Sequence, residues 1–265
     1  GVALEKNGPG EFVLYPLSDS SETDNSIRDI ILNEGKLSVE NAYALRTDRS
    51  PYSGTIYFRG GEFSHGSATD FSSNFSAEAD QQFRLTILGP GGTYNTALQS
   101  VRGAFELLSG NLTFAADNTY TGSTTVTNGL LTIGNDSVSD PSGSLNSTAP
   151  LVVASGAEVI LKNNIEVGSI SGSGTIDLGW SPDTYDLTVG GDNSNTAFSG
   201  ELQGSGTLVK KGSGALNLGL TTPNVGLDIV NSFQIESGTI VLTSPEAKDI
   251  RIDGSITKTT SDPAT

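Results

Sequence analysis

The sequence predicts an all-β protein folded as a parallel β-solenoid of about a dozen short rungs, with little or no helix. Three observations predict this fold: 33 glycines among 265 residues, a short glycine-led strand pattern, and a longer repeat of about 100 residues. Glycine is about twice as frequent as its usual ~7% share, in a chain without the composition of disorder, which indicates many tight turns. Apolar stripes with the helical period are missing, and the nearest candidate, residues 76–83, is one short polar turn.

The short pattern is a glycine, one spacer, and two apolar residues separated by a single residue. The alternation puts both apolar residues on one face of a strand, and the glycine permits a tight corner before it. Each copy therefore predicts a short strand after a turn. The clearest copies begin at Gly10, Gly35, Gly110, Gly174, Gly214 and Gly238.

The sequence also contains a second repeat with a longer period. Five landmarks, Leu4, Lys6, Gly8, Gly10 and Leu14, recur about 204 residues later as Leu208, Lys210, Gly212, Gly214 and Leu218. An intermediate register passes through Gly110, so the larger unit is about 100 residues long. We therefore expect one continuous solenoid over residues 1–243, with copies at about 8–109 and 110–213 and a partial third. Residues 244–265 are expected to form a C-terminal cap or a flexible tail.

Strand units that cannot bury their apolar face alone stack, so that neighbours share one core. A β-sandwich is the alternative, because it too contains many short strands with turn signals. A sandwich needs hairpins, however, and the Asn-Gly hairpin signal is clear only at Asn128-Gly129 and weaker at Asn7-Gly8. The solenoid is therefore preferred, as a rod of about 60 Å if each rung takes about 20 residues.

Composition excludes several classes of function. The net charge of −16 opposes the phosphate neutralisation that drives nucleic-acid binding. With no cysteine and one histidine, the chain has no disulfide, thiolate zinc site or redox chemistry, and we expect no cofactor. No stretch approaches the roughly 20 apolar residues of a membrane span. The lack of cysteine and methionine fits an extracellular protein, because both side chains are oxidation liabilities there.

A search for catalytic groups predicts none. A Ser-His-Asp triad would need His65, which we expect to be a polar loop residue, and no G-x-S-x-G elbow is present. Two carboxylate pairs, Asp183 with Asp186 and Asp136 with Asp140, could support glycan hydrolysis or lyase chemistry. Both pairs lie in turn-rich connections, where aspartate bonds its own backbone, so we expect solvated turn residues.

No metal site is predicted either. Residues 190–195 and 134–137 supply oxygen ligands for calcium, but neither follows the Gly-Gly-x-Gly-x-Asp nonapeptide rhythm or the EF-hand spacing.

Trp180 is the best candidate for contact with a glycan or a protein partner, with Tyr185 in the same segment. It is the only tryptophan and lies beside a turn, and a flat ring offers stacking area at little entropic cost. The competing interpretation, which the sequence favours, is a ring that covers the core beneath a loop.

One segment resembles a known family. Residues 118–133 read NTYTGSTTVTNGLLTI, similar to the autotransporter-associated β-strand repeat, whose usual form is N-T-Y-T-G-x-T-x-V followed by a G-x-L-x-V strand. Residues 168–178 and 187–218 resemble segments that precede that repeat in the same proteins. The resemblance covers about half of the chain in detail. It implies a right-handed parallel β-helix, secreted and displayed on a bacterial cell surface.

Three functions follow as expectations. The first is a non-enzymatic extracellular passenger, adhesin-like, that attaches to a host, matrix or glycan surface. The second is a structural subunit whose identical copies stack end to end into a fibre or sheath. The third is a β-helical carbohydrate-active enzyme, for which the sequence gives least support.

Overall fold

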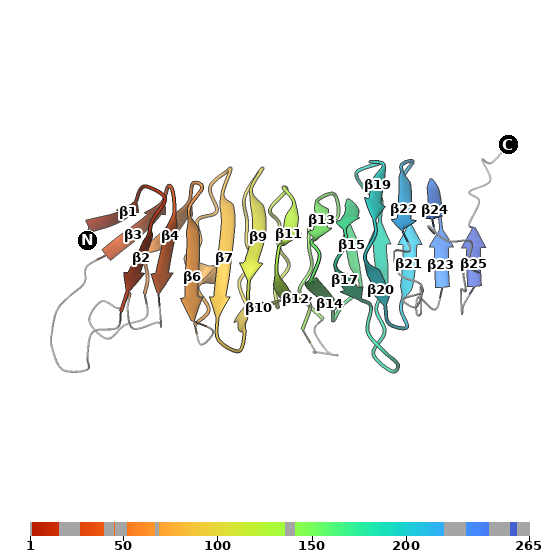
Figure 1. The fold of residues 1–265 in the computed structure, drawn as a ribbon, viewed down its shortest axis with the longest axis horizontal. Coiled ribbons are helices and arrows are strands. Elements are labelled where there is room, and N and C mark those ends of the chain that lie inside the picture. The colour runs from red at the N-terminus through yellow and green to blue at the C-terminus, as the bar shows by residue number, and fades with distance from the viewer. Residues whose placement is uncertain are drawn as a thin grey trace.

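The computed structural model describes residues 2–15, 27–39, 45, 52–66, 69–135, 141–219, 232–243 and 255–258. Over these ranges the chain forms an elongated rod, with β1 (Val2–Lys6) at one end and β25 (Ser255–Lys258) at the other (Figure 1). Every strand pairing between named strands is parallel, and, apart from β6 and β7, consecutive strands lie in different sheets, as in a solenoid. The helical structure in the described ranges consists of a short 3-10 turn, η2 (Ser72–Asn74), and a single 3-10 residue, Leu45. The predicted all-β parallel solenoid is therefore confirmed.

Four parallel sheets form the walls of the rod. The longest has eleven strands, slightly fewer than the predicted dozen rungs. Its strands in order are β2 (Glu11–Leu14), β4 (Lys36–Val39), β6 (Glu62–Gly66), β7 (Gln82–Leu88), β9 (Ala104–Ser109), β11 (Thr124–Val126), β13 (Pro150–Val153), β16 (Ser169–Gly172), β19 (Thr196–Phe198), β22 (Ala215–Gly219) and β24 (Thr239–Thr243).

Three shorter sheets complete the walls. A six-stranded sheet contains β8 (Gly92–Tyr94), β10 (Asn111–Phe114), β12 (Gly129–Ile133), β14 (Ala157–Leu161), β17 (Thr175–Asp177) and β20 (Glu201–Gln203). A three-stranded sheet contains β1 (Val2–Lys6), β3 (Ile27–Leu32) and β5 (Thr55–Phe58), and a five-stranded sheet contains β15 (Ile165–Val167), β18 (Leu187–Val189), β21 (Thr207–Lys210), β23 (Ser232–Ile235) and β25 (Ser255–Lys258). Within the segment expected to be a cap or tail, residues 255–258 thus form a strand that pairs with β23, and the rest lies outside the described residues.

The core is built from rows of side chains in register. One row runs through all eleven strands of the longest sheet: Phe12, Leu37, Phe63, Leu85, Leu107, Val126, Val153, Gly172, Phe198, Leu218 and Leu242. The hydrophobic members between the two ends are buried. Burial of each such side chain contributes about 1.5–3 kcal/mol, so the period-2 alternation of the sequence both builds the core and fixes the register.

The Asn-Thr-Tyr-Thr-Gly motif has a structural role for nearly every residue. Asn118 Oδ1 accepts from the Leu98 amide at 2.9 Å, and Asn118 Nδ2 donates to the Ser144 carbonyl at 3.2 Å, so one side chain joins three rungs. Tyr120 is buried, with its hydroxyl 2.6 Å from Thr124 Oγ1. A Cβ on Gly122 would lie 2.5 Å from the Gly103 carbonyl oxygen, so glycine is required where the two turns meet.

A buried lysine marks both ends of the 204-residue repeat. Lys6 and Lys210 take inward positions in their sheets, in register with Leu32 and Ile235. Lys6 Nζ donates to the carbonyls of Asn7, Gly8 and Glu34, at 3.1, 2.6 and 3.2 Å.

Lys210 repeats this arrangement. Its Nζ donates to the carbonyls of Lys211 and of Gly212, the latter at 3.1 Å. Burial lowers the pKa of Lys210, and the nearby charge of Asp192 opposes that shift. The repeated Lys-x-Gly-x-Gly sequence is therefore a turn whose carbonyls are held by an ammonium group from the preceding strand.

Replacing a corner glycine by alanine should reveal how tightly the turns stack. Gly129 and Gly156 both have positive φ, +91° and +82°, so alanine costs roughly 1–2 kcal/mol at either position through backbone strain. At Gly129 the added Cβ would also lie 2.1 Å from the Gly110 carbonyl oxygen, whereas at Gly156 it meets nothing within 4 Å. Urea unfolding should show Gly129→Ala losing at least about 2 kcal/mol more than the control Gly156→Ala. Equal losses would contradict the close stacking of corners.

Candidate functional site

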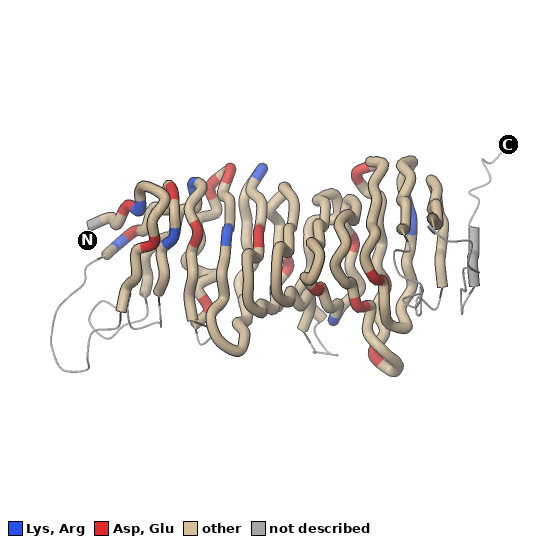
Figure 2. The backbone as a smooth tube through the Cα atoms, in the orientation of Figure 1, with Lys and Arg blue, Asp and Glu red and all other residues tan. Residues whose placement is uncertain are grey.

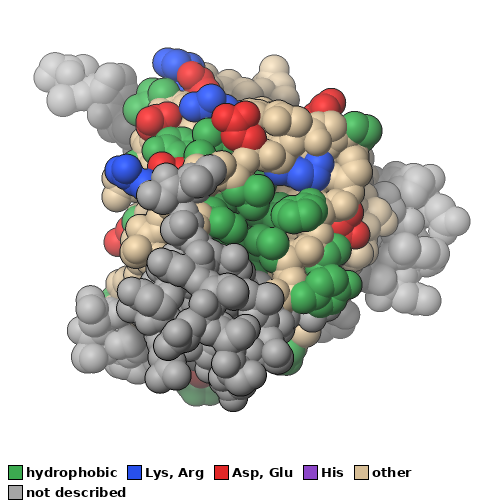
Figure 3. Space-filling view, turned by 90° about the vertical axis from the view of Figure 1, so that its left-hand side faces the viewer, with side chains coloured by type: hydrophobic (Ala, Val, Ile, Leu, Met, Phe, Trp, Pro, Cys, Tyr) green, Lys and Arg blue, Asp and Glu red, His purple; other side chains and the backbone are tan. Residues whose placement is uncertain are grey.

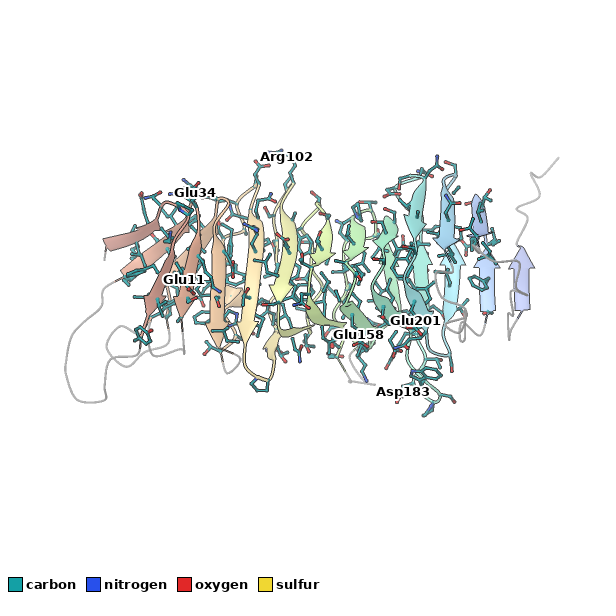
Figure 4. The ribbon with its side chains drawn as sticks, viewed as in Figure 1. Glu11, Glu34, Arg102, Glu158, Asp183 and Glu201 are labelled. Atoms are coloured by element: carbon teal, nitrogen blue, oxygen red, sulfur yellow. The ribbon has the colours of Figure 1, made fainter. Side chains whose placement is uncertain are left out.

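The loop between β17 and β18, residues 178–186, projects from one edge of the rod, and Asp183 lies at its outer end (Figure 4). Gly179, with φ of +76°, turns the chain out of β17. The amide of Asp183 donates to the Trp180 carbonyl at 2.9 Å, and the amide of Tyr185 donates to the Leu178 carbonyl at 2.8 Å. These bonds give the loop a defined shape.

Trp180 is 53% exposed, so the prediction that its ring covers the core beneath a loop is wrong. The indole Nε1 donates to Asp177 Oδ2 at 3.3 Å. Asp177 is itself almost fully buried, and its Oδ1 accepts from the Gly179 amide at 2.7 Å while its Oδ2 accepts from Gln203 Nε2 at 3.1 Å. The polar edge of the indole is therefore anchored to the sheet, and the remainder of the ring is offered to solvent.

Tyr185, and not Trp180, is the aromatic residue of this loop that covers the core. Its ring is half-buried and packs against the core cluster. It also lies so close to Gly179 that an added Cβ there would be 2.9 Å from it. The two candidate aromatic residues therefore differ in environment: Trp180 is exposed to solvent, and Tyr185 packs inward against the core.

The outer face of the six-stranded sheet continues from Trp180. Glu158, Thr175 and Glu201 lie in register on three successive strands, and Asp177 pairs with Gln203 in the next row. The alternate positions Val159, Ile176 and Leu202 are buried, so the polar rows face outward. Figure 4 shows Glu158, Glu201 and Asp183 near the same edge of the rod.

The carboxylates proposed for catalysis do not form a facing pair of free acids. Asp183 is exposed at the end of the loop. Asp186 bridges rungs instead: its amide donates to Asn164 Oδ1 at 2.9 Å, and its Oδ1 accepts from the Thr207 amide at 3.2 Å. Asp136 and Asp140 lie outside the described residues.

In the first segment proposed for calcium, the carboxylate oxygens of Asp192 are likewise engaged, and residues 136 and 137 of the second segment lie outside the described residues. Asp192 Oδ2 accepts from Ser169 Oγ at 2.6 Å, and Asp192 Oδ1 accepts from the amide and hydroxyl of Ser194 at 2.9 and 2.7 Å. Burial raises the pKa of Asp192, but these hydrogen bonds outweigh it and hold the pKa below its usual value. In the ranges that the structure describes, three or more acidic or histidine side chains nowhere gather as a metal site.

A second surface feature lies on the longest sheet, where a concavity of about 230 Å³ is lined by Gln82, Arg84, Ala104, Phe105, Glu106, Ser123 and Thr125. It belongs to a row of alternating charges in register across five strands: Glu11, Lys36, Glu62, Arg84 and Glu106. Lys36 lies 3.7 Å from Glu11 and 3.4 Å from Glu62, and Arg84 lies 2.9 Å from Glu106. Because these partly exposed charges satisfy each other, the row chiefly reinforces the register of the strands.

His65 is a core residue, so the prediction of a polar loop histidine is wrong. It lies in β6 with no exposed surface, in the row that also holds Val39 and Ile87. Its ring stacks on Tyr94 with centroids 5.8 Å apart and meets the edge of Phe71 at 5.0 Å. The sequence does contain a signal for this buried position: if residues 62–65 form a strand, their alternation places His65 on the same face as Phe63.

The hydrogen bonds of His65 define its protonation state. Nδ1 donates to the Gly66 carbonyl at 2.8 Å, so in the neutral ring Nε2 accepts from the Tyr94 hydroxyl at 2.6 Å. Burial lowers the pKa of His65 to about 4, opposed by the bond to Gly66 and by the charge of Asp70. At neutral pH the ring is an uncharged part of the aromatic core, closed to any substrate.

Comparisons with models of known protein families, with curated proteins and with solved structures found no match. The fold therefore defines the class, a parallel β-solenoid repeat protein. In the part of the chain that the structure describes, no helix has the length and apolar character needed to cross a bilayer.

His65 should make the protein sensitive to mild acid. Its pKa is about 4 in the folded protein and 6.5 in the unfolded chain, so the unfolded chain binds the proton first as the pH falls. Folding stability should therefore decrease between pH 6.5 and 4, by on the order of 3 kcal/mol from this residue.

The matched variant is His65→Leu, compared with the natural sequence by urea unfolding at several pH values. Both proteins retain the same carboxylates, so the difference between their pH profiles isolates the histidine. Stability should fall less steeply in the variant, and parallel profiles would refute the assignment.

Proposed function

We propose that this chain is a non-enzymatic, extracellular β-solenoid that is displayed on a bacterial cell surface and mediates attachment. The observation that supports it best is the rod itself, in which a sheet of eleven strands presents continuous outer rows of side chains along its length. A stacked repeat of this kind extends a surface away from its base and offers many equivalent contacts. The resemblance of residues 118–133 to the autotransporter-associated repeat supports the same assignment.

The acidic surface and the burial of the single histidine also support a non-enzymatic attachment function. Acidic residues are distributed along the rod (Figure 2), in keeping with the net charge of −16. Such a surface keeps neighbouring rods apart and favours neutral or cationic partners over polyanions. The single histidine, the usual general base at neutral pH, is buried and uncharged.

Surface display is tested on intact cells of the source bacterium. Antibodies raised against the purified chain should label non-permeabilised cells, and external protease should remove the label. Labelling that requires permeabilisation would contradict the proposal. A cytoplasmic protein probed in parallel controls for cell integrity.

End-to-end stacking into a fibre is a second candidate, because the edge strand β2 of the longest sheet exposes an apolar side chain of the core row. Phe12 on β2 is in register with the buried Leu37 and is itself 44% exposed. Figure 3 views the rod from the end that holds β2, where hydrophobic side chains gather on the surface. Negative-stain electron microscopy over a concentration series decides between the candidates: filaments that lengthen with concentration and disappear in Phe12→Glu support stacking, and single short rods at every concentration exclude it.

A further inference from the structure

Trp180 has the properties of a binding platform. It is a large aromatic side chain, about half exposed, on a loop whose backbone is held by internal hydrogen bonds. Its Nε1 is satisfied by Asp177, so the exposed ring has no unmet hydrogen-bonding requirement of its own. What it offers to a partner is an apolar surface whose orientation is already fixed, so that little conformational entropy is lost on binding.

The groups beside the ring are hydrogen-bonding groups. Glu158, Thr175 and Glu201 are partly exposed and follow one another on adjacent strands, which are spaced about 4.8 Å apart. Gln203 is also partly exposed and is tied to Asp177. A flat face with carboxylate, hydroxyl and amide groups at regular spacing beside an aromatic ring is complementary to a molecule that carries both C–H faces and hydroxyl groups.

We propose that Trp180 and the outer face formed by Glu158, Thr175, Glu201 and Gln203 bind a neutral glycan. The C–H face of a pyranose ring stacks on the indole, and the hydroxyl groups of neighbouring sugars donate to the two glutamates. The ligand class follows from charge: the carboxylates of Glu158, Glu201 and Asp183 lie near this edge of the rod, and the whole chain carries −16, so an anionic glycan is repelled. This inference rests on the proposed attachment function and names the chemistry of its target.

The single tryptophan makes the site directly observable. Because Trp180 is the only tryptophan in the chain, fluorescence excited at wavelengths that tyrosine does not absorb reports this site alone. A sugar stacked on the ring should shift the emission to shorter wavelength and reduce quenching by acrylamide. The probes are soluble neutral polysaccharides (a β-glucan, a mannan, a xylan and a galactan), with alginate as the anionic comparison.

Affinity electrophoresis through gels containing each polysaccharide measures binding. At least one neutral polysaccharide should retard the natural protein, and Trp180→Ala should weaken that retardation at least about tenfold, equivalent to 1.4 kcal/mol. Trp180→Phe should retain a large part of it. Tyr15→Ala is the matched control, because Tyr15 is also an exposed aromatic residue, at 65%, but follows β2 at the other end of the rod.

Two results would overturn the proposal: failure of every neutral polysaccharide to retard the protein or to shield Trp180, and equal retardation of Trp180→Ala and the natural protein. Stronger retardation by alginate would overturn the ligand class. A second assay measures how well the natural protein and Trp180→Ala attach to whole bacterial or host cells. This assay separates the glycan site from the proposed attachment function. If both proteins attach equally and neither binds a sugar, the glycan site is refuted and the attachment function is retained. If neither protein attaches, the proposed function is refuted.

Discussion

The direct stacking of each turn on the turn of the preceding rung is the constraint on which the rest of the structure depends. Leu130 donates its amide to the Gly110 carbonyl at 3.0 Å, and a side chain on Gly129 would collide with that same oxygen. Such close corners keep the strands on either side in register. Once register is fixed, the alternation of the sequence sends one row of side chains into the core and the next to solvent over the whole length of the rod.

Polar side chains at the turns strengthen the same contact. Asn118 and Asp186 bind backbone groups of neighbouring rungs, and the ammonium groups of Lys6 and Lys210 fill turns that would otherwise present only carbonyl oxygens. A buried turn needs partners for its backbone groups, and these side chains supply them. Asp177 links such a turn to the surface. Its carboxylate accepts from the Gly179 amide in the turn after β17 and also from the indole of Trp180, which it orients.

The fold could be predicted from sequence because its signals are local and repeated. Glycine followed by alternating apolar residues specifies a corner and a strand, and the repetition of that unit implies stacking. Individual polar and aromatic residues could not be placed in the same way. Whether His65 lies in a loop or in a core row depends on neighbours from other rungs, Tyr94 and Phe71, which sequence distance does not reveal. Trp180 and Tyr185 lie in one loop, and only the course of that loop decides which ring packs inward.

A distance measurement between two rungs tests the stacked parallel register most directly. Thr125 and Val241 belong to the same outward row of the longest sheet, five strands apart along its order β11, β13, β16, β19, β22, β24. The chain has no cysteine, so cysteines introduced at these two positions can be spin-labelled specifically. Pulsed electron paramagnetic resonance should give a narrow distribution near 24 Å, five steps of about 4.8 Å each. A broad distribution, or one centred far from that distance, would contradict the solenoid register and the surfaces that depend on it.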